Sequence, residues 1–400
     1  MASPEHGRML AFAPSEGFIW GMSVKLFSVI FSLLISFGAW AETSYSQFPN
    51  GPSADPNYFP IGVWLQGPNK IQQYKNIGIN VFVGFYGDLD QTSLAQFANA
   101  GMSLIPTQNN VGLTSAQQTA IKGWLPFDEP DNAQPDGKGG YGRPCIPPST
   151  VIGWYNDQKA NDPTRPVLLN FGKGVAKVNW VGRGSCRGDT SYYQKASAGA
   201  DILAFDVYPI SAGYPLEDIA KGVSNLRTWS NNQKIIWNYV EAAAINGGAV
   251  PTGGQVRSEV WMSIVHGSMG IVYFAHEFAP KFREDGLFNH PALVRAIGAL
   301  NAEIKSLAPV LNSPTLSGLQ TSSAVPVATM MKQYAGATYV FATAMRGTAT
   351  TASFTLPSVG PGTVEVINEN RTLALSDGKF QDSFAGYGVH LYRVATGLLR

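Results

Sequence analysis

Eight short apolar segments alternate with helical segments between residues 59 and 307, and this alternation constrains the fold more than any other feature of the chain. Short strands that alternate with helices are typical of a parallel sheet, and eight of them predict a (β/α)8 TIM barrel. The expected strands are 59–65, 81–84, 103–106, 125–127, 166–170, 202–206, 235–240 and 270–274. The expected helices are 70–77, 93–100, 115–122, 150–161, 191–198, 216–230, 255–266 and 291–307. A doubly wound open sheet is the alternative, but no G-x-G-x-x-G motif follows the first strand.

The pattern changes after residue 308. Helical periodicity stops, and segments rich in Thr, Ser, Val and Gly are separated by frequent turns. Alternation within these segments predicts an antiparallel β-sandwich, with strands at 325–331, 338–344, 350–356, 363–367 and 389–394. We therefore expect a catalytic barrel over 58–308, a C-terminal β-sandwich over 309–400, and a linker or crossing N-terminal segment over 42–57.

Residues 1–41 have the features of a leader with a secretory signal peptide. Lys25 supplies positive charge, residues 26–40 are almost continuously apolar, and residues 39–41 (Ala-Trp-Ala) form a small-x-small cleavage pattern. Met22 fits the start of such a peptide. The apolar stretch is shorter than the about 20 residues that a membrane span needs. The sequence therefore predicts a secreted or periplasmic protein with no stable membrane anchor.

The composition of the chain limits which kinds of molecule it can be expected to bind. Hydrophobic residues make up 44% of the chain and charged residues 14%, with a net charge of +1. This balance and the absence of a dense Lys/Arg run argue against nucleic-acid binding. Cys145 and Cys186 are the two cysteines of a chain expected to be exported, so they predict one disulfide, with two free thiols as the alternative. Metal-ligand spacings are missing from the sequence, and we expect no metal, no cofactor and a monomer.

Two glutamates each end a strand-like apolar segment. Glu129 closes the segment 124–129 and Glu241 closes the segment 235–241, and they are 112 positions apart (241 − 129). Three strand-helix units fit between them, which places them on strands four and seven, at the same end of an eight-stranded barrel. Two acids that face each other across a sugar ring are what hydrolysis of a glycosidic bond requires.

Other polar side chains follow the expected strands, where a barrel presents its catalytic groups. The candidates for substrate binding are Asp128, Asn170, Asp206, Tyr208, Tyr239, His276 and Glu277, with Trp64 as the best aromatic platform for a sugar. Each also has a structural interpretation: Asp206 with Tyr208 can brace a loop, and Glu241 can begin a helix. Glu277 is the rival of Glu241 for the role of nucleophile.

The chain resembles the retaining glycoside hydrolases of clan A over residues 58–308. The resemblance rests on Phe127-Asp-Glu-Pro130, Phe205-Asp-Val-Tyr-Pro209 and Tyr239-Val-Glu241. It implies Glu129 as the acid/base and Glu241 as the nucleophile of a double displacement, in which the nucleophile forms a covalent glycosyl-enzyme intermediate.

One position departs from the pattern of that clan, because Asp128 stands where an Asn usually precedes the acid/base. An ionised Asp accepts but does not donate a hydrogen bond, and its charge raises the proton affinity of Glu129. That charge would help Glu129 stay protonated. The sequence thus predicts an exported retaining glycoside hydrolase that acts on a polysaccharide or oligosaccharide. An inverting glycosidase and a non-catalytic carbohydrate-binding barrel remain as alternatives.

Overall fold

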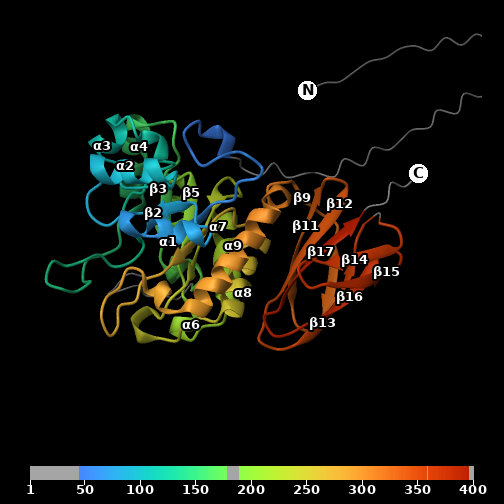
Figure 1. Cartoon of the computed structure of the whole chain (residues 1–400). Coiled ribbons are helices and arrows are strands. Elements are labelled where there is room, and N and C mark those ends of the chain that lie inside the picture. The colour runs from blue at the N-terminus through green and yellow to red at the C-terminus, as the bar shows by residue number, and fades with distance from the viewer. Residues whose placement is uncertain (1–44, 178–188, 358, 396–400) are drawn as a thin grey trace, which may run out of the picture. The chain divides into compact units, whose positions relative to one another are not determined.

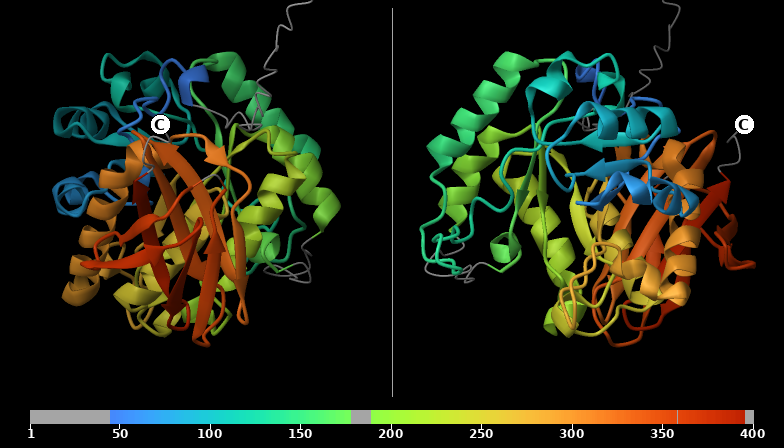
Figure 2. Two further views of the ribbon diagram at one scale, coloured as in Figure 1. Left: turned by 90° about the vertical axis from the view of Figure 1, so that its right-hand side faces the viewer. Right: turned by 60° about the vertical axis from the view of Figure 1, so that its left-hand side comes forward.

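The computed structural model describes residues 45–177, 189–357 and 359–395. Its N-terminal part is a parallel barrel with helices outside the strands (Figure 1, Figure 2). The barrel strands are β1 (Ile61–Trp64), β2 (Val81–Val83), β3 (Ser103–Ile105), β4 (Leu168–Phe171), β5 (Ile202–Phe205), β6 (Ile235–Ile236), β7 (Asn238–Glu241) and β8 (Ile271–Phe274).

Within the described ranges, no helix is both long and apolar enough to cross a membrane.

The barrel closes through two runs of hydrogen-bonded strands and three bridges. One run has the order β3-β2-β1-β8-β7, and the other has the order β4-β5-β6. The runs are joined by the isolated parallel bridges Leu104↔Ile121, Trp124↔Val167 and Asp206↔Tyr239. The predicted (β/α)8 barrel is therefore confirmed.

Two of the expected strands differ from the structure. The expected strand 125–127 is wrong, because the fourth position of the ring is held by the bridges of Ile121 and Trp124 alone. Pro126 has no N–H to donate to a ladder, which explains why pairing stops before it. The expected strand 235–240 is interrupted at Trp237, so that β6 pairs with β5 and β7 pairs with β8.

The helices of the barrel do not all begin at a capping side chain. They are α1 (Ile71–Asn76), α2 (Gln91–Ala100), α3 (Asn110–Thr114), α4 (Pro148–Asn161), α5 (Thr190–Ala196), α6 (Pro209–Ala212), α7 (Glu217–Trp229), α8 (Gly253–Val265) and α9 (Pro291–Leu311). Asp90 and Thr252 start α2 and α8 with reciprocal capping boxes. The expected helix 115–122 is wrong, because Asn109 caps the earlier helix α3 by accepting from the amide of Gly112 at 2.8 Å.

Large apolar side chains fill the barrel interior. Trp237 and Tyr239 project into it from the interrupted strand, together with residues such as Leu168 from β4. Tyr45, from the segment expected to be a linker, also packs in this cluster. Its hydroxyl accepts from the Trp237 indole at 2.7 Å and donates to the Met269 carbonyl at 2.9 Å. The N-terminal segment therefore closes the end of the barrel at which the strands begin.

The C-terminal domain is antiparallel (Figure 2, orange to red). One sheet has the order β15-β14-β17-β12-β11-β9 and the other β10-β13-β16, around a shared apolar core. The strands are β9 (Thr315–Leu316), β10 (Gln320–Ser323), β11 (Val327–Tyr334), β12 (Ala337–Ala344), β13 (Thr350–Thr355), β14 (Gly362–Val366), β15 (Arg371–Leu375), β16 (Lys379–Phe384) and β17 (Val389–Ala395). Of these, β9, β10, β15 and β16 were not expected from the sequence.

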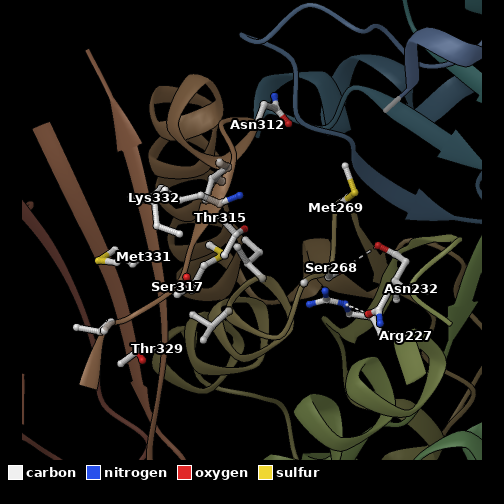
Figure 3. A pocket seen from close by; sticks show the side chains of 18 of the residues that line it. Arg227, Asn232, Ser268, Met269, Asn312, Thr315, Ser317, Thr329, Met331 and Lys332 are labelled. Atoms are coloured by element: carbon white, nitrogen blue, oxygen red, sulfur yellow. Dashed lines mark hydrogen bonds between the residues drawn. The ribbon is translucent and has the colours of Figure 1, made fainter. Parts of the chain in front are cut away.

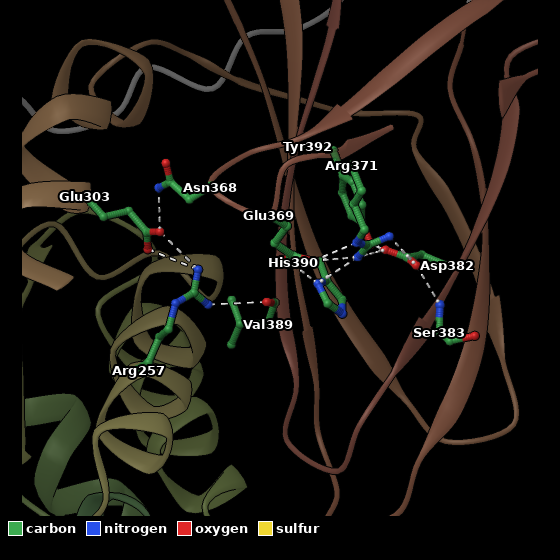
Figure 4. Close-up of polar contacts among 10 residues, drawn as sticks. All are labelled: Arg257, Glu303, Asn368, Glu369, Arg371, Asp382, Ser383, Val389, His390 and Tyr392. Atoms are coloured by element: carbon green, nitrogen blue, oxygen red, sulfur yellow. Dashed lines mark hydrogen bonds and ion pairs between the residues drawn. The ribbon is translucent and has the colours of Figure 1, made fainter. Parts of the chain in front are cut away.

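Helices α8 and α9 of the barrel pack against this domain (Figure 4). The Trp261 ring on α8 stacks on Phe341 of β12 with centroids 5.2 Å apart. Glu303 on α9 accepts from the Trp261 indole at 3.0 Å and forms an ion pair with Arg257 at 3.1 Å. Arg257 in turn donates to the carbonyl of Val389 at 3.3 Å. An apolar stack with a polar rim therefore joins the two domains.

Two helical glycines offer a matched test of the packing between helices and strands. A Cβ added at Gly222 on α7 would lie 2.2 Å from the Phe205 ring of β5, whereas a Cβ at Gly153 on α4 meets nothing within 4 Å. We expect Gly222→Ala to lower the free energy of unfolding by about 1–3 kcal/mol through overpacking. Gly153→Ala should be neutral or stabilising by up to about 1 kcal/mol, because alanine favours helix. Urea unfolding measures both, and equal effects would contradict this packing.

Candidate active site

The described residues line two large cavities, at opposite ends of the barrel strands. One, of about 700 Å³, lies where β6 and β8 begin and is bordered by β9 and β11 (Figure 3). It contains none of the predicted site residues. The other, of about 680 Å³, lies at the carboxyl ends of the strands and is called the cleft below. Six predicted residues line the cleft, namely Trp64, Asp128, Glu129, Asp206, Tyr208 and His276. Asn170, Tyr239, Glu241 and Glu277 do not line it.

Asn170 at the end of β4 holds the turn that carries the first two acids. Its backbone carbonyl accepts from the amide of Glu129 at 3.0 Å, and its side chain donates to Asp128 at 2.9 Å. Glu129 has φ of 45°, in the left-handed region that side-chain-bearing residues seldom adopt. Such backbone strain is concentrated at functional sites. Asn170 therefore holds the turn from behind the cleft, and its predicted contact with substrate stays a prediction.

Asp206 and Glu129 form a carboxyl pair. Asp206 follows β5, and its side chain is hydrogen-bonded to that of Glu129. Burial raises the pKa of Asp206 well above its usual value, and the negative charges of Glu129 and Asp128 raise it further. Asp206 therefore keeps its proton at a pH where an isolated aspartate has lost it.

Two tyrosines surround this pair. Tyr208 is hydrogen-bonded to Asp206 and lines the cleft. Tyr239 on β7 packs edge-on against Trp64 at 5.5 Å, and its buried hydroxyl has no hydrogen-bond partner within the described ranges. Burial raises the pKa of Tyr239, and the charges of Asp128 and Asp206 add to the shift. Both phenols therefore remain protonated hydrogen-bond donors beside the acids.

A fourth acid, missed by the sequence analysis, lies two residues after Glu129. Asp131 is buried and accepts from the amide of Gly172 at 2.8 Å and from the hydroxyl of Tyr193 at 2.8 Å. Burial raises the pKa of Asp131 to about 7, with a further contribution from the charge of Glu129. A Cβ at position 172 would lie 2.6 Å from the side-chain nitrogen of Asn132 and 2.9 Å from a carboxyl oxygen of Glu129, so a larger residue would displace both side chains.

Glu241, the predicted nucleophile, is fully buried behind the wall of the cleft. Its carboxylate accepts from the amides of Ile210 at 2.5 Å and Ser211 at 2.8 Å, at the start of α6. The charge of Glu241 acts on Glu259 of α8, which is fully buried as well. The structure therefore groups Glu129 with Asp128 and Asp206, and does not bring Glu241 to the surface of the cleft.

Two predicted residues remain: His276 lines the cleft, and Glu277 does not. His276 is buried, and its Nε2 donates to the carbonyl of Leu65 at 3.0 Å. Burial lowers the pKa of His276, which keeps its imidazole neutral. Glu277 accepts from His290 at 2.6 Å and Asn289 at 2.8 Å. Burial raises the pKa of Glu277, but these two hydrogen bonds outweigh it and hold the pKa below its usual value. Glu277 thus braces a loop.

The sequence analysis missed most of the apolar lining of the cleft. Its walls include Leu65, Tyr86, Val207, Tyr214, Ile245, Phe274 and Phe278. Tyr86 and Phe278 lie in irregular segments after β2 and β8, where no periodicity indicates their direction. Cys186, one half of the predicted disulfide, lies outside the described residues, so the disulfide stays a prediction.

Comparison with known proteins gives the fold. No protein-family model and no curated protein matches the sequence. The structure is similar to an α-amylase from Anoxybacillus, with a TM-score of 0.51 and 10% identity over 86% of this chain and 99% of that one. It is also similar to a putative α-galactosidase/melibiase from Bacteroides fragilis, with a TM-score of 0.51 and 9% identity over 84% of this chain and 79% of that one. At such identities the likeness supports a barrel with a C-terminal β domain and leaves the reaction open.

The buried pair Glu241–Glu259 predicts a pH effect on stability. Burial, followed by the charge of Glu241, raises the pKa of Glu259 well above 4.5. As the pH rises above 4.5, the unfolded chain releases this proton while the folded chain keeps it, so the free energy of unfolding falls. Glu259→Gln stays uncharged in both states, so its stability should fall less between pH 5 and 8.

Urea unfolding at several pH values measures this difference. Glu365→Gln is the matched control, because the Glu365 side chain is 54% exposed on the C-terminal domain. Wild type and the Glu365 variant should lose stability in parallel as the pH rises. If the Glu259 variant followed the same curve as both, Glu259 would not hold a proton in the folded state.

Proposed function

We propose that the protein is a glycoside hydrolase. The observation that carries the proposal is the group of three carboxyls, Asp128, Glu129 and Asp206, which line a cleft with aromatic walls at the carboxyl ends of the barrel strands. Hydrolysis of a glycosidic bond requires a carboxyl that is still protonated near neutral pH. Aromatic rings match the apolar C–H face of a pyranose. Carbohydrate is therefore the substrate that fits both the acids and the walls.

Glu129 delivers the proton in this mechanism. It lines the cleft, and its side chain is hydrogen-bonded to that of Asp206, whose pKa is raised by burial and by the charges of Glu129 and Asp128. Asp206 is the positioning partner of the pair. After the bond breaks, Glu129 accepts a proton from the attacking water.

A second carboxylate stabilises the positive charge that develops at the anomeric carbon. The sequence assigns this role to Glu241 in a double displacement, but Glu241 is fully buried and accepts from two amides of α6. Asp128 lines the cleft, so we assign the role to Asp128. The anomeric configuration of the first product, read by NMR, distinguishes double displacement from inversion.

Four variants test these roles. Glu129→Gln should lower kcat by roughly 10²–10⁴-fold, the usual contribution of acid/base catalysis. Asp128→Asn should also lower kcat, and Asp206→Asn should shift the pH dependence of kcat. Glu241→Gln should remain active. An activated aryl glycoside, which needs no proton on its leaving group, should partly rescue Glu129→Gln. Loss of turnover in Glu241→Gln, with activity restored by azide, would return the nucleophile to Glu241.

We further propose that the protein is exported, as a monomer with a disulfide between Cys145 and Cys186. The apolar N-terminal stretch and the Ala-Trp-Ala pattern support this proposal. Expression with the native leader should yield a mature chain beginning at Glu42, and mass spectrometry without reductant should find no free thiol. A retained leader or two free thiols would contradict the proposal.

A further inference from the structure

Asp131 is a buried acid that the proposed mechanism does not use. Its side chain is 4% exposed and does not line the cleft. It nevertheless lies two residues after Glu129, and the charge of Glu129 acts on it. Burial of a carboxyl is unfavourable unless hydrogen bonds compensate for the lost water. The groups that bind Asp131 therefore indicate what it does.

Two donors from different elements hold the carboxyl of Asp131. Its Oδ1 accepts from the backbone amide of Gly172 at 2.8 Å, and its Oδ2 accepts from the hydroxyl of Tyr193 at 2.8 Å. Gly172 immediately follows β4, and Tyr193 lies on α5. Asp131 therefore ties the segment that carries Glu129 to the end of β4 and to a helix on the outside of the barrel.

The ring of Tyr193 is held by two other aromatic rings. It stacks on Trp229 of α7 with centroids 4.9 Å apart and an interplanar angle of 8°, and it packs edge-on against Phe171 of β4 at 5.3 Å. Tyr193 is buried as well. This packing directs the Tyr193 hydroxyl to Asp131, so the hydrogen bond needs no rearrangement to form.

Gly172 links Asp131 to Glu129. The amide of Gly172 donates to Asp131, and a Cβ on Gly172 would lie 2.9 Å from a carboxyl oxygen of Glu129. The Glu129 carboxyl therefore packs against the same residue whose amide Asp131 binds. Because a displacement of about 1 Å can strongly reduce catalysis, a change at Asp131 that moves Gly172 also affects Glu129.

We propose that Asp131 is a positioning residue of the reaction, which fixes the peptide against which Glu129 packs and whose charge opposes loss of the Glu129 proton. This inference rests on the proposed function. The titratable groups that interact with Asp131 are Glu129 from its own segment and Tyr192 and Tyr193 from α5. Burial raises the pKa of both tyrosines, so they stay neutral. Glu129 is therefore the group among these whose charge Asp131 influences.

The interaction of the two acids is measured first without substrate. In protein labelled with 13C at the aspartate carboxyl carbons, loss of a resonance in Asp131→Asn assigns Asp131. Burial raises the pKa of Asp131 to about 7, the charge of Glu129 adds to the shift, and the hydrogen bond from Tyr193 opposes it. The NMR titration midpoint should therefore fall in Glu129→Gln and rise in Tyr193→Phe.

Asp189→Asn is the matched control for this titration. It removes an exposed charge at the start of α5, and asparagine caps a helix as well as aspartate does. The midpoint of Asp131 should not change in this variant. A midpoint that does not respond to Glu129→Gln would overturn the inference, whether or not the protein is a hydrolase.

The effect on catalysis is measured with a panel of neutral oligosaccharides, whose leaving groups need the proton. Asp131→Asn should lower kcat by roughly 10- to 100-fold through misplacement of Glu129. Its alkaline limb of kcat should also lie at lower pH than that of the wild type, because the last proton of two interacting carboxyls leaves at a higher pH than the proton of one. Asp189→Asn should match the wild type in both respects.

Two outcomes separate the inference from the proposed function. A lower kcat in Asp131→Asn with an unmoved alkaline limb would reduce Asp131 to a structural group, and would overturn the inference while keeping the hydrolase. If the wild type released reducing ends from no oligosaccharide of the panel, while the midpoint of Asp131 still responded to Glu129→Gln, the proposed function would be overturned and the interaction of the two acids would stand.

Discussion

The hydrogen bond between the carboxyls of Asp206 and Glu129 is the interaction on which the cleft depends. Two carboxyls in hydrogen-bond contact cannot both ionise without placing like charges together in a poorly solvated site. The nearby charge of Asp128 makes loss of the proton still less favourable. Asp206 is therefore still protonated at a pH where carboxyls on the protein surface are ionised. The raised pKa of Asp206 results from its burial and from the charges of Glu129 and Asp128 together.

The backbone and side chains at the end of β4 hold these acids close together. Asn170 sits at the end of β4 and fixes both members of the Asp128–Glu129 turn. Gly172, two residues later, allows the close approach of Glu129, and its amide binds the buried Asp131. The left-handed backbone of Glu129 is the local cost of this arrangement. Strands that are buried on both faces can sustain such strain because their own hydrogen bonds leave them little freedom to relax.

The sequence predicted the features that depend on local pattern. The short apolar strands and the acids at their ends follow from spacing alone, so the barrel and the placement of Glu129 could be expected. The helix 115–122 was wrong because one capping side chain, Asn109, starts the helix earlier. The direction of Glu241 depends on amides about 30 residues away, and Asp131 is bound by a hydroxyl 62 residues away. Contacts of that range leave no periodic signal.

Glu241 nonetheless belongs to the same functional unit as the cleft. Its carboxylate binds the first amides of α6, and Tyr208, Ser211 and Ala212 around that helix line the cleft. Glu259 supplies the opposing group from α8, where both members of the pair are removed from water. Glu241 and Glu259 thus anchor the wall beside Tyr208 from behind, while Glu129 and Asp206 line the cleft itself. A glutamate at the end of a barrel strand can therefore be a structural group, and the burial of its side chain and its amide partners are what indicate that role.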